Sequence, residues 1–414
     1  MLCENINTLR KPEGNCFSIL FSGDFCVRSE KTLELIEKGD APEIVGDVKK
    51  VFDNSDIRVL QWETVCGLEG EPIIKSGPNL HNPEWCVDFA LSLGVDIALL
   101  ANNHTGDFGP DMILKTIERL EANNLKTVGA GKNLKDACEF LLIEQNGITI
   151  AILNYCENEF GTAKADLPGT APYNVVNIAN ALKKAKNAAD IVILTLHGGH
   201  EQNPLPSLRM RDEFRFFASC GADIVFNCHT HCMEGIEVVN GTPIIYSPGN
   251  FFFPKDMLVG GNEKRDIVWR TGYMPKFYCD KSGVYAFEII PYRFNCEKIS
   301  LLTGKQYSDC IKYVNKISKI ISDDAALKRY FDGWCFANGL HGYFHALRKE
   351  LPDFEKKNGD YADIIAGYCD MRNLFTCESH NDLIKNSLRI IEENRIEEAE
   401  IAAGEVEKLK ELDF

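Results

Sequence analysis

The amino-acid sequence predicts an α/β protein that ends in a helical region, and three observations support this prediction. From about residue 15 to 295, short apolar runs rich in β-branched residues alternate with polar loops and helical stretches, which is the pattern of an α/β domain. Side chains that can bind ligands end most of these runs. After about residue 300, longer amphipathic helical patterns replace the short runs. We therefore expect a domain at 15–297 and a helical region at 298–414.

Six apolar runs predict the main strands. They are FSILFSGD at 17–24, IRVLQWE at 57–63, VDIALLANNH at 95–104, ITIAILNY at 148–155, DIVILTLHGGHE at 190–201 and ADIVFNCHTH at 222–231. Five of the six end in Asp, Glu, Asn or His. Because ligands collect at the carboxyl ends of strands in open α/β sheets, these ends predict one shared site.

Further elements follow the sixth run. Asn240-Gly241 separates two apolar runs, which predicts a β-hairpin. The stretch 283–294 predicts another strand, and the mixture of Lys, Asp, Gly and Pro at 255–282 predicts a loop that is either a lid or a surface excursion. Residues 305–324 and 381–412 have the periodicity of amphipathic helices.

Composition excludes several classes of protein. The formal net charge is −16 and no basic stripe is present, so a nucleic-acid partner is not expected. No segment approaches the about 20 consecutive apolar residues of a membrane helix, and the N-terminus lacks the features of a signal peptide. We expect a cytoplasmic protein without membrane insertion, whose 16 cysteines are thiols. An anionic substrate would need local positive charge, which a divalent cation can supply.

The polar strand ends suggest a metal centre. Carboxylate and amide oxygens together with imidazole nitrogens suit Mn, Fe or Zn, and the lack of a thiolate quartet argues against a structural zinc site. A pair of ions would need a bridging oxygen, for which Glu63 is the candidate. Simpler roles are also open: Asp24 as a helix cap, Asn103 as a turn former and Glu63 as a surface carboxylate. We expect His81, His341, His345 and His380 to be ordinary core or surface residues.

Six short motifs resemble those of one known family. They are Gly23-Asp24, the strand end at Glu63, A-N-N-H-x-x-D-x-G at 101–109, H-x-G-x-E at 197–201, x-H-x-H at 228–231 and S-x-G-N-F at 247–251. In this order and spacing they resemble the CapA family, named after poly-γ-glutamate capsule synthesis, whose domain is similar to the calcineurin-like metallophosphoesterases. The likeness covers about residues 17–292.

The resemblance implies a four-layer αββα sandwich of metallophosphoesterase type with two divalent ions at the strand ends. It implies the metal ligands Asp24, Glu63, Asn103, His197, His229 and His231. His104 would donate a proton to the leaving group. Asp107 would orient His104 or close the turn before Gly109, and Glu201 would position a ligand. Asn250 either reaches the site or only shapes its own turn.

One departure from the family pattern affects the metal site. Metallophosphoesterases usually begin with D-x-H, whereas this chain has Asp24-Phe25-Cys26. A histidine ligand is therefore missing or replaced by Cys26. Arg209 and Arg211 could hold a substrate anion, but a solvated helix face is the simpler interpretation.

The predicted function is a metal-dependent hydrolase that acts on a phosphoester, or on an amide if the substrate resembles a γ-glutamyl linkage. The expected partner is an anionic small molecule or polymer, and the sequence leaves the oligomeric state open. The alternative is a non-catalytic component of a polymer-synthesis or scaffolding assembly. In that case the metal site would be vestigial and the helical region would bind the partner.

Overall fold

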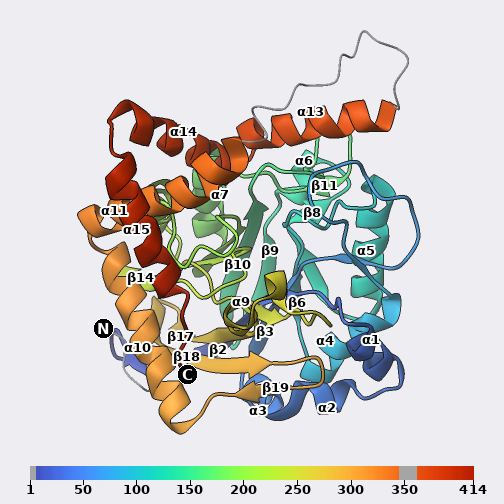
Figure 1. The fold of residues 1–414 in the computed structure, drawn as a ribbon. Helices are drawn as coiled ribbons and strands as arrows, with labels where there is room; N and C mark the ends of the chain where they lie inside the picture. Colours follow the sequence, from blue (N-terminus) through green and yellow to red (C-terminus); the bar gives the residue numbers. More distant parts are fainter. Residues whose placement is uncertain (1–5, 345–360) are drawn as a thin grey trace.

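The computed structural model of the chain describes residues 6–344 and 361–414 and contains two large β-sheets (Figure 1). The first sheet contains β1 (Asn7–Thr8), β2 (Cys16–Phe25), β3 (Ile57–Trp62), β6 (Ile97–Leu99), β7 (Lys126–Val128), β16 (Asn250–Phe252), β17 (Thr271–Asp280), β18 (Gly283–Phe294) and β19 (Ile299–Leu301). Its order is β1-β18-β17-β2-β3-β6-β7, with β16 beside β2 and β19 beside β18. The second sheet contains β9 (Leu141–Gln145), β10 (Ile148–Cys156), β12 (Ile191–His197), β13 (Ile224–Cys228), β14 (Ile236–Val239) and β15 (Thr242–Ile245). Its order is β14-β15-β13-β12-β10-β9.

The two sheets pack face to face. Successive side chains along each strand point to opposite faces of the sheet, and both faces are apolar. In β10, Ile150 and Ile152 join the cluster between the sheets, which also contains Phe21 and Val59 of the first sheet. The neighbouring Leu153 joins a different cluster on the outer face. This period of two, with both faces apolar, is expected of a sheet that is covered on both sides.

Helices cover both outer faces. The first sheet is covered by α1 (Glu30–Glu37), α2 (Ala41–Val45), α3 (Lys49–Asp53), α4 (Val87–Leu93) and α5 (Pro110–Ala122), together with the 3-10 turns η1 (Gly46–Val48) and η2 (Glu84–Cys86). The second sheet is covered by α6 (Leu134–Ala137), α7 (Val175–Ala188) and α8 (Leu208–Ser219). Two small ladders, β4 (Val65–Cys66) with β5 (His81–Asn82) and β8 (Ala130–Gly131) with β11 (Gly169–Thr170), lie outside the sheets. The predicted four-layer αββα arrangement is confirmed.

All six predicted strands form, and the hairpin follows them as expected. Strands β2, β3 and β6 are parallel in one sheet, and β10, β12 and β13 are parallel in the other. Strands β14 and β15 pair antiparallel. Between them Asn240 has φ 52° and Gly241 has φ 89°, the left-handed pair that a two-residue hairpin turn requires.

The prediction of a loop at 255–282 is wrong over much of this range. It contains the 3-10 turn η3 (Val259–Gly261), α9 (Glu263–Arg270) and strand β17, which pairs with both β2 and β18. Gly272, Pro275 and Lys276 obscure the strand pattern in the sequence. Burial of Tyr273 and Phe277 between the sheets outweighs these weak strand formers.

The C-terminal region is helical, as predicted. It contains α10 (Gly304–Ile321), α11 (Asp324–Trp334), the π-helical segment η4 (Cys335–Tyr343), α13 (Tyr361–Thr376), α14 (Glu378–Glu392) and α15 (Ile396–Leu409). The single helix predicted at 381–412 is two helices, because Asn394 adopts φ 53° between α14 and α15. Helix α10 places Val314 in the core between the sheets. Helices α13 and α14 lie across one end of the sheets (Figure 1), and His345 lies outside the described residues.

No helix among the described residues combines the length and the apolar character needed to cross a membrane.

A fully buried carboxyl group leads to a prediction about stability. Glu234 is 0% exposed, and neither of its carboxyl oxygens has a hydrogen-bond partner among the described residues. Burial alone raises the pKa of Glu234 well above its ordinary value. The folded chain therefore keeps a proton that the unfolded chain releases. The contribution of the Glu234 carboxyl to stability is fully present below pH about 4.5 and is lost as the pH rises.

Glu234→Gln is expected to increase the free energy of unfolding at pH 8 by about 1–3 kcal/mol, and to change it much less at pH 4. Denaturant titrations of both proteins across this pH range measure the difference. Glu237→Gln is the control, because Glu237 binds Arg215 with an N–O distance of 2.6 Å and its replacement should be destabilising. An equal effect of Glu234→Gln at both pH values would show that its carboxyl titrates normally.

Candidate metal centre

Side chains from both sheets converge at the carboxyl ends of the parallel strands. Asp24 is the penultimate residue of β2, and Glu63 directly follows β3. Asn103 follows β6, and His197 ends β12. His229 and His231 follow β13, whose last residue Cys228 is in register with His197. All six predicted ligands are buried, and the structure brings them together.

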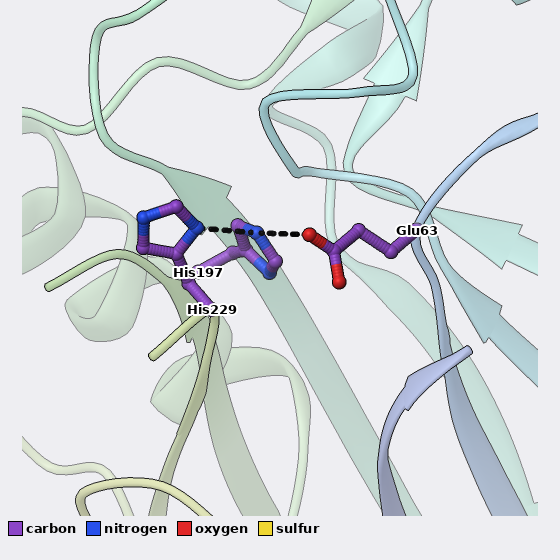
Figure 2. A group of neighbouring side chains, drawn as sticks. All are labelled: Glu63, His197 and His229. Carbon is purple, nitrogen blue, oxygen red and sulfur yellow. Dashed lines mark hydrogen bonds and ion pairs between the residues drawn. The ribbon is translucent and has the colours of Figure 1, made fainter. Parts of the chain in front are cut away.

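One group of potential ligand atoms surrounds His197. Its Nε2 lies 3.1 Å from Asn103 Oδ1, 3.2 Å from His229 Nδ1 and 3.6 Å from Glu63 Oε1. Figure 2 shows the imidazoles of His197 and His229 and the Glu63 carboxylate directed toward one another from different elements. Neighbouring ligands of a tetrahedral ion with bonds of about 2.1 Å are about 3.4 Å apart, so these spacings suit a cation.

A second group shares Glu63 with the first and consists of Asp24, Glu63 and His231. His231 Nδ1 lies 2.8 Å from Asn250 Oδ1, and the Asn250 amide donates to Trp269 O at 3.0 Å. His231 Nδ1 is therefore the donor to Asn250, which leaves Nε2 facing Glu63 Oε1 at 3.6 Å. Asn250 thus reaches the site and orients His231, as outer hydrogen bonds commonly do for histidine ligands.

The buried acceptors of both groups lack donors. Asp24 Oδ1, both carboxyl oxygens of Glu63 and His197 Nδ1 have no hydrogen-bond partner among the described residues. Burial, followed by the charge of Asp24, raises the pKa of Glu63 well above its ordinary value. Burial also lowers the pKa of His197, which favours a neutral imidazole. Unpaired buried carboxylates are costly, and divalent cations would satisfy the oxygens of Asp24 and Glu63.

The backbone at the two last histidines is unusual. His229 has φ 102° and His231 has φ 54°, in the left-handed region that side-chain-bearing residues rarely adopt. The His229 amide donates to Asp24 Oδ2 at 3.2 Å. Such strained positions concentrate at functional sites, so the geometry agrees with a ligand-binding role for this loop.

His104 is held beside the centre by two charged side chains. Its Nδ1 lies 2.7 Å from Asp107 Oδ2 and 3.2 Å from Lys75 Nζ, and Lys75 also forms an ion pair with Asp107. Burial lowers the pKa of His104, while its hydrogen bond to Asp107 opposes that shift. Asp107 both orients His104 and closes the turn, because its amide donates to His104 O at 3.1 Å. Sequence reasoning missed Lys75, which no motif marks.

Cys26 belongs to neither group of potential ligands. Its side chain is 0% exposed and packs in the apolar cluster with Phe25, Trp62 and Cys86. Burial raises the pKa of this thiol, with the Glu63 charge as the next cause. Of the two possibilities left by the sequence, the geometry favours a missing ligand over its replacement by a thiolate.

A cavity of about 380 Å³ opens beside His104 and His229. The C-terminal helices supply much of its wall, including Trp334, Asn338, Tyr343, Asp370, Asn373 and His380. The wall also includes Glu159, His200 and Glu201, and Glu201 is exposed. His380 lines the cavity and its Nε2 lies 3.1 Å from the hydroxyl of Tyr343, which agrees with an ordinary hydrogen-bonded residue. Sequence reasoning also missed His200 and Glu159, although Glu159 follows β10 and lies 3.9 Å from His229 Nε2.

Both interpretations of Arg209 and Arg211 are wrong. Arg209 donates to Glu157 Oε1 at 2.6 Å, and Glu157 also accepts from Ser379 N and Oγ at 3.2 and 2.9 Å. Arg211 is buried and pairs with Asp324 of α11. These ion pairs fasten the C-terminal helices to the α/β part.

Comparisons with known proteins identify the family. The profile of the family described as bacterial capsule synthesis protein PGA_cap matches residues 18–255. The PGA biosynthesis protein CapA of Bacillus subtilis is 35% identical over 194 residues, which is 46% of this chain and 49% of that protein. The capsule biosynthesis protein CapA of Bacillus anthracis is 27% identical over 297 residues, which is 70% of each chain. The match thus spans about half the length of the first relative.

A solved structure of a phosphatase from Mycoplasma pneumoniae aligns with a TM-score of 0.42 and 16% identity, and covers 71% of this chain and 96% of that one. A likeness at this level adds nothing to the argument. The family profile covers more than half of the sequence and contains all six of the motifs in full. The chain therefore belongs to the bacterial capsule synthesis protein family PGA_cap.

Proposed function

We propose that this protein is a metal-dependent hydrolase of phosphoesters or of γ-glutamyl-type amides, with an anionic small molecule or polymer as its substrate. The observation that carries the proposal is the set of buried, unpaired carboxylate and imidazole atoms at the carboxyl ends of strands from both sheets. Membership of a capsule synthesis family and the names of its Bacillus relatives support a role related to a capsule polymer.

Asn103, His197 and His229 would hold one divalent ion, Asp24 and His231 would hold another, and Glu63 would bridge the two. The mixture of oxygen and nitrogen ligands suits Mn, Fe or Zn. Such ions would supply Lewis acidity that lowers the pKa of a bound water and neutralises substrate charge.

His104 would donate a proton to the leaving oxygen or nitrogen. Asp107 fixes its orientation by accepting from Nδ1 at 2.7 Å, which leaves Nε2 for the substrate. Burial opposes the protonated form, and the negative charge of a bound substrate would restore it. Lys75 compensates the charge of Asp107, so the buried carboxylate remains an acceptor.

One observation favours the alternative of a non-catalytic scaffold. The position of the usual histidine ligand is occupied by the buried thiol of Cys26, which leaves the Asp24 group with fewer ligands. A scaffold, however, has no need for the oriented pair of His104 and Asp107.

We also propose that the protein is cytoplasmic. All of the described cysteines are free thiols, which supports this location.

Metal analysis and hydrolysis assays test the proposal. Purified protein is expected to contain one or two equivalents of Mn, Fe or Zn, and to hydrolyse either bis-(p-nitrophenyl) phosphate or a γ-glutamyl anilide. Treatment with a chelator should abolish the activity, and added Mn²⁺ should restore it. A protein that binds no metal, hydrolyses neither compound and captures a partner equally well with chelator present would be the scaffold instead.

A further inference from the structure

The cavity beside the metal centre has one wall that lies outside the residues matched by the family profile. The profile ends at residue 255, whereas Trp334, Tyr343, Asp370, Asn373 and His380 come from the C-terminal helices. The profile match therefore carries no information about this wall, and its role is inferred from its own side chains.

The wall is held in place and does not resemble a hinged lid. Helix α14 begins at Glu378. In the first turn of this helix, Ser379 N and Oγ donate hydrogen bonds to the buried carboxylate of Glu157. Arg209 pairs with the same carboxylate, and the Asn158 amide donates to Glu378 at 2.9 Å. A negative charge at a helix N-terminus is stabilising. These buried pairs therefore fix this wall of the cavity to the α/β part.

Three carboxylates line the cavity. They belong to Glu159, Glu201 and Asp370, whereas the ammonium of Lys75 already contacts Asp107 and His104. Asp370 and Asn373 are three residues apart on α13 and so share one face of the helix. Cations bound by Asp24 and Glu63 would add positive charge beside these carboxylates, so the cavity would offer groups of both signs.

A buried acceptor without a donor provides an independent sign of a ligand. Asn373 is 4% exposed, and its amide nitrogen donates to Ser76 Oγ at 3.3 Å and to Glu159 Oε2 at 3.5 Å. This fixes the orientation of the amide, and Asn373 Oδ1 has no partner among the described residues. A buried carbonyl oxygen next to carboxylates requires a hydrogen-bond donor.

We propose that the part of this cavity formed by Glu159, Asp370 and Asn373 binds a primary ammonium group of the substrate. This inference depends on the proposed function, because it places the anionic, cleavable group at the metal centre and the amine beside it, at these three side chains. An ammonium has three N–H donors, which match the two carboxylates and the unpaired amide oxygen. A cavity of about 380 Å³ is of the size that holds a small molecule, so the part of the substrate bound here is a zwitterionic group.

Binding of two matched probes tests this inference without any turnover. Calorimetry on the full-length, Mn²⁺-loaded protein would compare 2-aminoethyl phosphate with ethyl phosphate, which lacks only the amine. The aminated compound is expected to bind at least about tenfold more tightly, as a charge-assisted hydrogen bond predicts. Asp370→Asn should reduce this preference severalfold and leave the affinity for ethyl phosphate unchanged or higher.

Glu392→Gln is the matched control, because it removes one negative charge from an exposed position on α14 away from the cavity. It should keep the full preference for the amine. Equal binding of the two phosphates by the wild type, or an equal loss of preference in both variants, would overturn the inference alone. Failure of both phosphates to bind the metal-loaded protein would also overturn the inference, whereas failure of the protein to bind Mn²⁺ would overturn the proposed function as well.

Discussion

Glu63→Gln is expected to reduce the affinity for Mn²⁺ or Zn²⁺ by more than about 100-fold, since even outer-sphere changes cost 10–100-fold. Glu63 is the residue common to both groups of potential ligands, and its carboxylate is 0% exposed. An amide has one acceptor oxygen and no charge, so it cannot serve two ions. Metal content after dialysis and calorimetric titration of the chelator-treated protein measure the loss.

The same substitution should change stability in opposite directions with and without metal. Burial penalises the ionised form of Glu63 and raises its pKa, so without metal the neutral amide should be at least as stable as the wild type. At 100 times the dissociation constant, bound metal should stabilise the wild type by about 2.7 kcal/mol. For a chain of 414 residues this corresponds to a melting temperature about 3 °C higher. The variant should gain little.

Glu201→Gln is the control for Glu63→Gln. Glu201 lies on the cavity wall but is exposed and belongs to neither group of ligands. Its replacement should leave the metal content near that of the wild type. Identical metal binding by all three proteins would refute the assigned bridging role.

His104→Ala is expected to lower kcat by about 10²–10⁴-fold, the usual contribution of a positioned general acid, while the metal content stays unchanged. The prediction rests on the contact of His104 Nδ1 with Asp107 at 2.7 Å and on the location of His104 in the cavity wall. Steady-state kinetics on a p-nitrophenyl ester and on an ester with a poorer leaving group measure the effect. The loss should be larger for the poorer leaving group, because that group needs the proton more.

His81→Ala is the control for His104→Ala, since His81 is exposed and lies outside the cavity. It should retain wild-type kinetics. A parallel loss of bound metal in His104→Ala would assign His104 a role in holding the ligands, and an unchanged kcat would exclude it from catalysis.

Much of the fold could be predicted from the sequence because its signals are local. The runs at 57–63 and 190–201 are mostly apolar along the strand and carry Glu63 and His197 at its end, so both the strand and its functional end are visible. The hairpin follows from Asn240-Gly241 alone. By contrast, β17 contains Gly272, Pro275 and Lys276, and only its place between β2 and β18 makes it a strand.

The sequence by itself determined the α/β class, the strand ends that carry Asp24, Glu63, Asn103, His197, His229 and His231, and the helical character of the C-terminal region. Each of these depends on residue type and spacing within a few positions along the chain. Only the tertiary structure decided that Lys75 contacts His104, that Cys26 packs away among apolar side chains, and that Asn373 and His380 face the cavity. These contacts join residues that lie far apart along the chain. The positions of Asn373 and His380 depend in addition on the buried pairing of Glu157 with Arg209 and Ser379, which no local pattern encodes.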